Sequence, residues 1–422
     1  MKAARRLYDM LMYASAAHAR WDYEASMNIL RSRKKMLIIL ALAAPAILVS
    51  IAMAADIDVL PAALGGKAAY SPAYYTPGIF VVSIFIGLAA GLITGCIGAG
   101  GGFIITPALM SAGIKGILAV GTDLFHIFAK AIMGTAVHKK LGNVSVGLAV
   151  AFLGGSIVGV MGGGVVNRAL YEANPVLSDT FISVVYVVLL GFLGFYSLAD
   201  FLKQRGKDDA GAHGAHGAEP EGQSLPSKLQ SARIPPMITF DTDLVPGGKQ
   251  ISWVFVAFCG VIVGVTAAIM GVGGGFLTFP MFVYVLGVSS FTTVGTDILQ
   301  IIFTAGFAAI SQYAVYGFIF YTLAMGMLLG SLLGIQLGAL TTRVIKGIYI
   351  RGFYATAILA GFLNRLFALP GKLNEMKLIE LSEPTAKMLT TAGNWVFFAV
   401  VGVFAVWVLS TFFSKIKLLK EA

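Results

Sequence analysis

Long apolar runs separated by short polar segments make up most of this chain. Ten runs are long enough to cross the roughly 30 Å hydrocarbon layer of a bilayer as helices, and they lie at residues 36–55, 78–98, 117–137, 143–166, 180–202, 251–271, 293–313, 317–341, 348–369 and 394–414. Two shorter apolar pieces, residues 100–112 and 273–286, each follow a cluster of glycines. We expect these pieces to be short crossing helices or re-entrant segments. The pattern predicts an all-α membrane protein.

A glycine-rich motif occurs twice in the chain, at residues 98–107 and 271–280. Each copy is followed by the sequence Val-Gly-Thr-Asp, which ends at Asp123 in the first copy and at Asp297 in the second. The copies are 173 residues apart at the glycines and 175 residues apart further on. Such a match indicates an internal duplication. Transporters with two related halves place broken helices and buried polar groups at corresponding positions, so the repeat favours transport.

Small residues continue the match beyond the aspartates. The equivalent pairs are Gly155 with Gly330, Gly159 with Gly334 and Gly163 with Gly338. Within a membrane, glycine lets helices approach closely, and close packing takes the place of the hydrophobic effect between helices. We therefore expect these glycines to lie at helix–helix interfaces.

Breaks in the hydropathy pattern divide the chain into parts. These are a cytoplasmic tail (1–35), a first transmembrane helix with an external loop (36–77), a first transmembrane repeat (78–202), a hydrophilic linker (203–250), a second transmembrane repeat (251–369), and an external loop with a final helix and a basic tail (370–422). Residues 31–54 also resemble a secretory signal with its cleavage site. An uncleaved first helix is favoured, because about 30 residues precede the basic cluster and a usual signal n-region is shorter.

Composition agrees with a membrane protein, because 58% of the residues are apolar and only 12% are charged. The net charge of +10 lies mainly in tails and loops, so it indicates cytoplasmic anchors and not nucleic-acid binding. The same rule puts both termini in the cytoplasm. Arg168 and Arg343 stand at equivalent helix ends, where we expect them to reach the lipid head groups.

The orientation of the repeats follows from these charges. If the short glycine-led segments cross the membrane, each repeat has five crossings and the second repeat starts from the opposite side. The expected architecture is two inverted repeats of about five transmembrane segments each, with glycine-broken helices and an extra helix at either end of the chain.

The glycine clusters are candidate sites for an anion. Consecutive glycines disfavour a helix, since each costs up to about 1 kcal/mol relative to alanine, so the helix should break there. The next helix then begins with exposed N–H groups at its positive dipole end, which attract an anion. Tight packing of crossing helices is the alternative explanation. The candidate substrate-binding residues are Gly98, Gly100, Gly101, Gly102, Thr122, Gly271, Gly273, Gly274, Gly275 and Thr296.

A polar helix face follows each glycine cluster. It consists of Asp123, His126 and Lys130 in the first repeat and of Asp297, Gln300 and Thr304 in the second. A carboxylate in a membrane segment is costly and usually functional. The candidate coupling residues are Asp123, His126, Lys130, Asp297 and Gln300, with a proton on Asp123 or His126 as one hypothesis. Helix capping by the aspartates, and neutralisation of Lys130 by Asp123, are the structural alternatives.

Metal ions and cofactors are not expected. His213 and His216 lie in a glycine-rich part of the linker without a third ligand, which favours a flexible loop over a metal site. Cys96 and Cys259 occupy non-equivalent apolar positions, which gives no support for a disulfide or a metal site.

The duplicated Gly-x-Gly-Gly-Gly-Phe motif with its following proline, the Gly-Thr-Asp helix, and the basic turn before Gly142 resemble the TauE/SafE family of sulfite exporters. The resemblance covers roughly residues 78–202 and 251–369. It implies an all-helical permease of the bacterial inner membrane that moves small sulfur-containing or carboxylate anions, such as sulfite, sulfate, thiosulfate or sulfonates. The residues by themselves indicate only an anion.

We therefore predict a secondary transporter and not an enzyme, with a small anion and the lipid bilayer as its partners. No nucleotide-binding motif is present, which argues against ATP as the energy source. Two alternatives stay open: an intramembrane enzyme that uses Asp123 and Asp297 as a paired acid and base, and an accessory membrane subunit without a substrate of its own. Homo-oligomer formation, the direction of flux and the coupling ion are also open.

Overall fold

A computed structural model describes residues 77–97, 101–138, 145–204, 225–241, 247–341, 345 and 347–415. The predicted tail 1–35, the first predicted helix 36–55 and much of the linker lie outside these residues. All nine other predicted spans fall on helices, and the longest extension beyond a prediction is in the last helix, which begins at Glu383.

The first half consists of α3 (Pro77–Ile97), α4 (Gly102–Ser111), α5 (Gly116–His138), α6 (Val146–Ala173) and α7 (Pro175–Gln204). The second half consists of α9 (Trp253–Met270), α10 (Gly275–Pro280), the π-helix η5 (Met281–Val285), α11 (Ser290–Ala308), the π-helix η6 (Ala309–Ala314), α12 (Tyr321–Thr341) and α13 (Gly347–Glu375). The final helix is α14 (Glu383–Ser414).

Seven helices in the described part of the chain are long and apolar enough to cross a membrane, namely α3, α6, α7, α9, α12, α13 and α14. The polar helices α5 and α11, which carry Asp123 and Asp297, are not among them. α4 has 10 residues, which at 1.5 Å per residue gives about 15 Å, or half of the hydrocarbon layer. The chain is a mostly helical, multi-pass membrane protein with short helices among the long ones.

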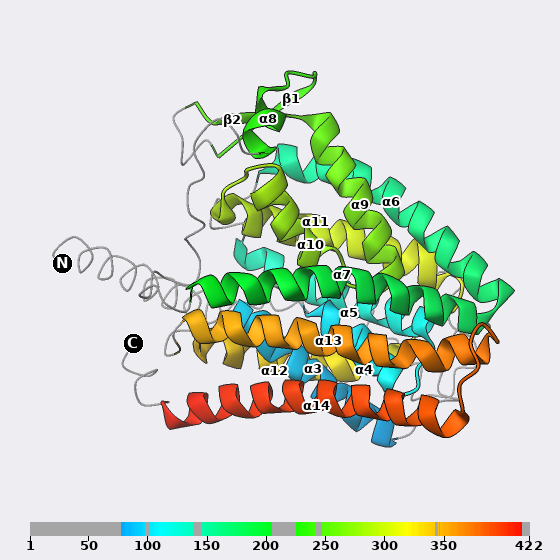
Figure 1. Cartoon of the computed structure of the whole chain (residues 1–422). Coiled ribbons are helices and arrows are strands. Elements are labelled where there is room, and N and C mark those ends of the chain that lie inside the picture. Colours follow the sequence, from blue (N-terminus) through cyan, green and yellow to red (C-terminus); the bar gives the residue numbers. More distant parts are fainter. Residues whose placement is uncertain are drawn as a thin grey trace, which may run out of the picture.

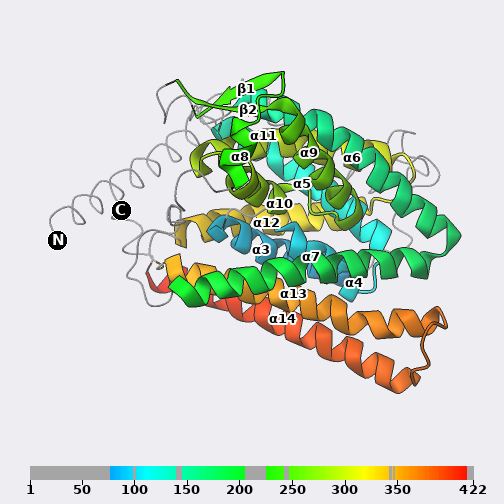
Figure 2. The same ribbon diagram turned by 45° about the horizontal axis from the view of Figure 1, so that its top comes forward.

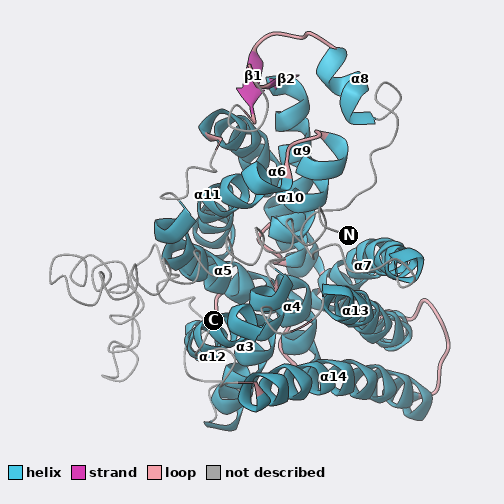
Figure 3. Cartoon of the chain, turned by 90° about the vertical axis from the view of Figure 1, so that its left-hand side faces the viewer, coloured by secondary structure: helices cyan, strands magenta, loops and turns pink. Residues whose placement is uncertain are grey.

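Helices of the first half pack mainly against helices of the second. The most extensive contacts join α3 to α12 and α6 to α9, followed by α7 to α13, α13 to α14 and α5 to α11. Figure 3 shows α4, α5 and α10 in the interior, with α6 and α9 on one side of them, α3 and α12 on the other, and α14 on the outside. Figure 1 shows α7, α13 and α14 running side by side.

Glycines make the two closest interfaces feasible. A Cβ atom on Gly155 of α6 would lie 1.8 Å from the carbonyl oxygen of Ala257, and one on Gly330 of α12 would lie 1.9 Å from that of Ile84. Gly159, Gly163, Gly334 and Gly338 meet the backbone of the same two partner helices, α9 and α3. The prediction that these glycines serve helix packing is confirmed.

The described part of the linker holds α8 (Leu225–Ser231) and two strands, β1 (Met237–Phe240) and β2 (Lys249–Ser252). The strands pair antiparallel, with Met237 opposite Ser252, so the fold departs from the all-α expectation at this point. Pro235 and Pro236 prevent a helix from running into β1. Figures 1 and 2 show α8, β1 and β2 together at one edge of the molecule, next to α9 and α11.

The linker docks on the connection between η5 and α11. The backbone N–H of Ser289 donates to Asp241 Oδ2 at 2.9 Å, and its hydroxyl donates to Asp241 Oδ1 at 2.7 Å. Gln230 Nε2 donates to the carbonyl oxygen of Leu286 at 2.8 Å. Ser289 also accepts a hydrogen bond from the N–H of Thr292 and thereby caps α11. The linker is thus tied to the start of the helix that carries Asp297.

Candidate functional site

The two glycine motifs lie where one helix ends and a shorter one begins. α3 ends at Ile97 and α4 begins at Gly102, after Gly101 with φ 69°. α9 ends at Met270 and α10 begins at Gly275, after Gly274 with φ 89°. Both preceding residues have the positive φ that favours glycine. Glycine is therefore required for the backbone path at these two positions, whatever else they do.

Of the other predicted glycines, Gly98 and Gly100 lie outside the described residues. Gly271 and Gly273 have φ values of 79° and 66°. A Cβ atom on Gly271 would lie 2.8 Å from Thr106 Oγ1, and one on Gly273 would lie 2.6 Å from Ile127 Cγ2. The second motif thus packs directly on α4 and α5 of the first half.

The two motifs meet each other in the interior. Phe103 and Phe276 are equivalent residues of the two copies, and their rings stack with centroids 5.3 Å apart. A Cβ atom on Gly102 would lie 2.8 Å from the Cα atom of Val272. Equivalent pieces of two halves, 173 residues apart in sequence, therefore form one contact region.

A buried carboxylate stands at the first residue of each short helix. A Cβ atom on Gly102 would be 3.3 Å from Asp123 Oδ2, and one on Gly275 would be 3.3 Å from Asp297 Oδ2. Asp123 is 0% exposed and Asp297 is 8% exposed. The structure thus brings each predicted coupling aspartate to the predicted glycine cluster of its own half.

In the first half the polar cluster is incompletely hydrogen-bonded. Thr106 Oγ1 donates to Asp123 Oδ2 at 3.0 Å, and His126 Nε2 is 2.9 Å from Ser331 Oγ of α12. Asp123 Oδ1 and His126 Nδ1 face each other at 3.7 Å. Neither of these two buried atoms has a hydrogen-bond partner among the described residues. Lys130 lies further along α5 and is partly buried.

In the second half the equivalent cluster is a closed network. Gln300 Nε2 donates to Asp297 Oδ1 at 2.8 Å and to Thr278 Oγ1 at 3.1 Å. Thr304 Oγ1 donates to Gln300 Oε1 at 2.9 Å, and Ser156 Oγ of α6 is 2.9 Å from Thr304 Oγ1. Gln300 thus occupies the position of His126 and satisfies the carboxylate beside it.

The threonines that precede the aspartates connect the two halves. The N–H of Phe320, at the start of α12, donates to Thr122 Oγ1 at 2.9 Å. The N–H of Ser145, at the start of α6, donates to Thr296 Oγ1 at 3.0 Å. Both hydroxyl oxygens therefore have a structural partner, and substrate binding by Thr122 and Thr296 stays a prediction.

Two arginines are buried in the described part of the chain, Arg168 and Arg365. Arg168, which was expected to reach the head groups, is only 9% exposed and donates to Gln312 Oε1 at 2.6 Å. Its guanidinium also lies 4.0 Å from the ring centroid of Tyr316. Arg365 of α13 is 2% exposed and did not figure in the sequence-based site. Its position inside the predicted span 348–369 was the available signal, because a charge within such a segment is usually functional.

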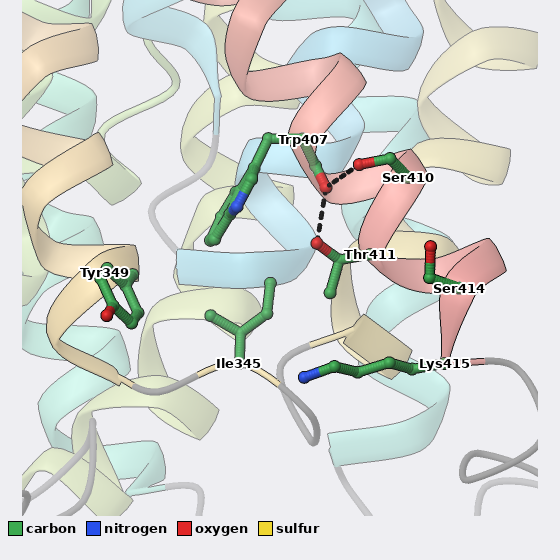
Figure 4. Close-up of a pocket in the computed structure, with 7 residues that line it drawn as sticks. All are labelled: Ile345, Tyr349, Trp407, Ser410, Thr411, Ser414 and Lys415. Atoms are coloured by element: carbon green, nitrogen blue, oxygen red, sulfur yellow. Dashed lines mark hydrogen bonds between the residues drawn. The ribbon is translucent and has the colours of Figure 1, made fainter.

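A cavity of about 380 Å³ lies away from these clusters, between the start of α13 and the end of α14. It is lined by Ile345, Tyr349, Trp407, Ser410, Thr411, Ser414 and Lys415. Figure 4 shows the hydroxyls of Ser410 and Thr411 turned back to the carbonyl oxygen of Trp407, to which they donate. None of the predicted site residues lines this cavity.

Metal ligands do not converge in the described part of the chain, where no three His, Cys, Asp or Glu side chains form a group suited to a metal ion. Cys96 and Cys259 are buried free thiols. His213 and His216 lie outside the described residues.

Residues 83–364 match the family model described as "Sulfite exporter TauE/SafE". The chain belongs to the TauE/SafE family. The match runs from α3 into α13, so it includes both glycine motifs and both aspartates of this TauE/SafE protein. The membership makes the chain a membrane transporter and not an enzyme.

Two relatives from Bacillus subtilis (strain 168) agree with this membership. The chain is 25% identical over 276 residues to the "Probable membrane transporter protein YunE". The aligned part makes up 63% of this chain and 89% of the relative. The chain is also 24% identical over 263 residues to the "Probable membrane transporter protein YjnA", and this alignment covers 61% of the chain and 87% of that relative. No solved structure matches the chain.

Proposed function

We propose that this TauE/SafE protein is a secondary transporter of small sulfur-containing or carboxylate anions, such as sulfite, sulfate, thiosulfate or sulfonates, in the bacterial inner membrane. It works by alternating access, in which one group of helices moves against another around a central site. The observation that carries this proposal is the meeting of the two glycine motifs through Phe103 and Phe276, with a buried carboxylate beside each motif.

Two inverted repeats are part of the proposal, and the place of one connection in each half supports them. In the first half, the connection after α4 lies beside the start of α7, because the N–H of Gly116 donates to Asp179 Oδ1 at 2.7 Å. This is also the end of α6, since a single residue, Asn174, joins α6 to α7. The connection after α4 therefore lies at the C-terminal end of α6.

In the second half, the equivalent connection lies after η5. Lys249 Nζ of β2 donates to the carbonyl oxygen of Gly287 in this connection at 3.4 Å. The partner strand β1 reaches the start of α6, where a Cβ atom on Gly147 would be 3.0 Å from Ile238 Cγ2. α6 has 28 residues, which span about 42 Å. Equivalent connections at opposite ends of one long helix are what an inverted pair of repeats requires.

The anion site itself is proposed at the start of α4 and of the α10–η5 segment, where glycine-broken helices present their first N–H groups. The first N–H groups of a helix have no partner within it, and the helix dipole favours an anion there. Asp123 and Asp297 stand at the same positions and repel an anion when they are ionised. Anion binding is therefore favoured when a proton neutralises the carboxylate.

Coupling to protons is proposed at Asp123 and His126. The atoms Asp123 Oδ1 and His126 Nδ1 lie 3.7 Å apart, are fully buried and have no hydrogen-bond partner in the described chain. A proton on this pair removes negative charge from the site, so the proton and the anion move in the same direction. The direction of net flux then follows from the two gradients.

The decisive experiment measures flux through proteoliposomes that contain the purified full-length protein. Sulfite, sulfate, thiosulfate, sulfoacetate and chloride are tested separately, with and without a pH gradient. We expect uptake of at least one sulfur oxyanion, and faster uptake when the outside is more acidic than the lumen.

Absence of flux for every anion would overturn the proposal. Copurification with a partner subunit together with absent flux would favour an accessory subunit instead. Gly162→Ala supplies the control variant, because a Cβ atom at Gly162 has no neighbour within 4 Å.

A further inference from the structure

Arg365 of α13 is a buried cation whose hydrogen-bond partners are all neutral. Its side chain is 2% exposed. Nε donates to Asn364 Oδ1 at 2.8 Å, and Nη2 donates to Ser111 Oγ at 2.8 Å and to the carbonyl oxygen of Pro107 at 3.4 Å. Nη1 donates to no residue in the described part of the chain, and no described carboxylate forms an ion pair with Arg365.

Two other cations on the same helix form ion pairs with carboxylates. Arg351 and Lys372 lie 14 residues before and 7 residues after Arg365, so they share its face of α13. Arg351 pairs with Asp200 of α7 at 3.9 Å, and Lys372 pairs with Asp179 of α7 at 2.9 Å. Both are more exposed than Arg365, with 22% and 20% of their side chains accessible. Asp179 also attracts Arg365 electrostatically, but its carboxylate is paired with Lys372. The most deeply buried of these three cations is thus the one without an ion-pair partner of its own in the described chain.

Helix capping is too weak to explain this arrangement. A cation near the C-terminal carbonyls of α4 gains a modest electrostatic benefit from the helix dipole. Burial of a guanidinium without a counter-charge costs far more than that benefit. Charged groups inside membrane segments are expensive and mark substrate or ion pathways. A counter-ion that visits the site resolves the imbalance.

Arg365 lies between the glycine motif and one end of the helical assembly. Gly361, one turn earlier in α13, packs near the carbonyl oxygen of Phe103, which is 3.7 Å from the place of a Cβ atom. Pro107 ends the first copy of the motif, and Lys372 lies beyond Arg365, where α13 pairs with Asp179 near the start of α7. An anion that travels between that end and the glycine motif passes this level of α13.

The polar groups around Arg365 suit an oxyanion. Asn364 Nδ2 donates to Ser111 Oγ at 3.1 Å and to Asn394 Oδ1 of α14 at 2.8 Å. The hydroxyl and the amides can reorient to donate to an incoming oxygen atom. The planar guanidinium fork binds oxyanions through parallel N–H groups, which an ammonium group cannot do.

We propose that Arg365, Ser111 and Asn364 form a second anion-binding site, at the end of α4, for the small oxyanion that the protein transports. This proposal rests on the proposed function for the identity of the ligand class. α14, which lies outside the duplicated part of the chain, supports the site through Asn394.

The test compares Arg365→Lys with the wild-type protein and with the control Arg351→Lys, which keeps its pairing partner Asp200. Initial flux against anion concentration gives KM, and anion-dependent thermal stabilisation of the purified protein by sulfite, thiosulfate or chloride gives binding without transport. We expect Arg365→Lys to raise KM by about tenfold and to weaken stabilisation by the oxyanions, since lysine keeps the charge and loses the fork. Arg351→Lys should change neither quantity.

A purely structural role predicts the opposite pattern, with a lower melting temperature for Arg365→Lys in the absence of anion and an unchanged KM. That result would overturn the second site. Failure of the proposed function is distinguishable, because a wild-type protein without flux can still be stabilised by an oxyanion in a manner that Arg365→Lys reduces. A wild-type protein that neither moves nor is stabilised by any of these anions would overturn both proposals.

Discussion

The polar clusters around Asp123 and Asp297 occupy equivalent places in the two halves, yet only one of them is closed. Gln300 donates to Asp297 and accepts from Thr304, so every group in the second cluster has a partner. His126 faces Asp123 at 3.7 Å, and the two facing atoms have no hydrogen-bond partner in the described chain. An unsatisfied buried polar atom costs free energy. The difference is the basis of our proposal that the first cluster, and not the second, takes up the proton.

The surroundings of the clusters are otherwise alike. An Oδ2 atom of each aspartate lies 3.3 Å from the place of a Cβ atom on the first glycine of the short helix in its half. Each preceding threonine accepts a hydrogen bond from a backbone N–H at the start of a helix in the opposite half. Equivalent substitutions in these glycines and threonines should therefore have equal effects on stability in the two halves. Equivalent substitutions in the polar helix faces should have different effects.

The largest effect is expected at the shared helix interfaces. Gly155→Leu and Gly330→Leu should each abolish folded protein, because even a Cβ atom would lie 1.8 and 1.9 Å from a backbone oxygen of the partner helix. Overpacking of this kind costs about 3 kcal/mol or more when the backbone cannot yield. Size-exclusion profiles of the detergent-solubilised variants measure the outcome. Gly402→Leu is the matched control, since a Cβ atom there has no neighbour within 4 Å. A monodisperse Gly330→Leu variant would contradict the expectation that the two interfaces are equally intolerant of a side chain.

A functional difference is expected next, between the aspartates. Asp123→Asn should abolish the acceleration of flux by a pH gradient, because the amide stays neutral and cannot take up or release the proton that moves with the anion. Asp297→Asn should keep the pH response, since Gln300 already satisfies that carboxylate. Flux in proteoliposomes at two external pH values tests both. Equal loss of the pH response in the two variants would show that the halves share the coupling role.

A smaller effect is expected when the first cluster is made to resemble the second. His126→Gln places in the first half the residue that stands in the second, and it should let the amide donate to Asp123. We expect a folded protein with a melting temperature equal to or above that of the wild type, and a weaker pH response of flux. Gln300→His is the reciprocal control and should lower stability, since it removes the donor to Asp297. A full pH response in His126→Gln would exclude His126 from coupling.

The smallest effect is expected at the threonines. Thr122→Val and Thr296→Val should each destabilise the protein by about 1–3 kcal/mol, because each leaves a buried N–H without its acceptor. The N–H groups are those of Phe320 and Ser145. Thermal unfolding of both variants, with the corresponding serine substitutions as controls, should give similar losses in the two halves. A loss of stability in only one of the two variants would show that the two threonines are not equivalent.

Much of the fold could be predicted from the amino-acid sequence. Apolar length predicted every described long helix, because a membrane requires runs of about twenty apolar residues. Duplicated motifs at a nearly constant spacing predicted two related halves. The glycines at the later repeat positions predicted close packing, since a missing side chain is visible in the sequence and its consequence in lipid is general.

Other features could not be read from the chain. The strands β1 and β2 lie in the polar linker and have four residues each. Strands this short contain too few residues for a recognisable alternation of apolar and polar positions. The closure of the second cluster depends on Ser156, which α6 of the first half supplies to Thr304 at 2.9 Å. The partners of Arg365 could not be read from the sequence either, because Ser111 and Pro107 of α4 lie more than 250 residues away from it along the chain.

The division has a physical basis. The sequence by itself determined which segments are helical, where the backbone needs glycine, and which chemical groups recur in both halves, because these properties depend on local periodicity and on residue type. Only the tertiary structure decided that α3 packs on α12 and α6 on α9, and hence which polar atoms find partners. Hydrogen bonds between halves depend on distances of a few ångströms between segments far apart in the chain, and no local pattern records those distances.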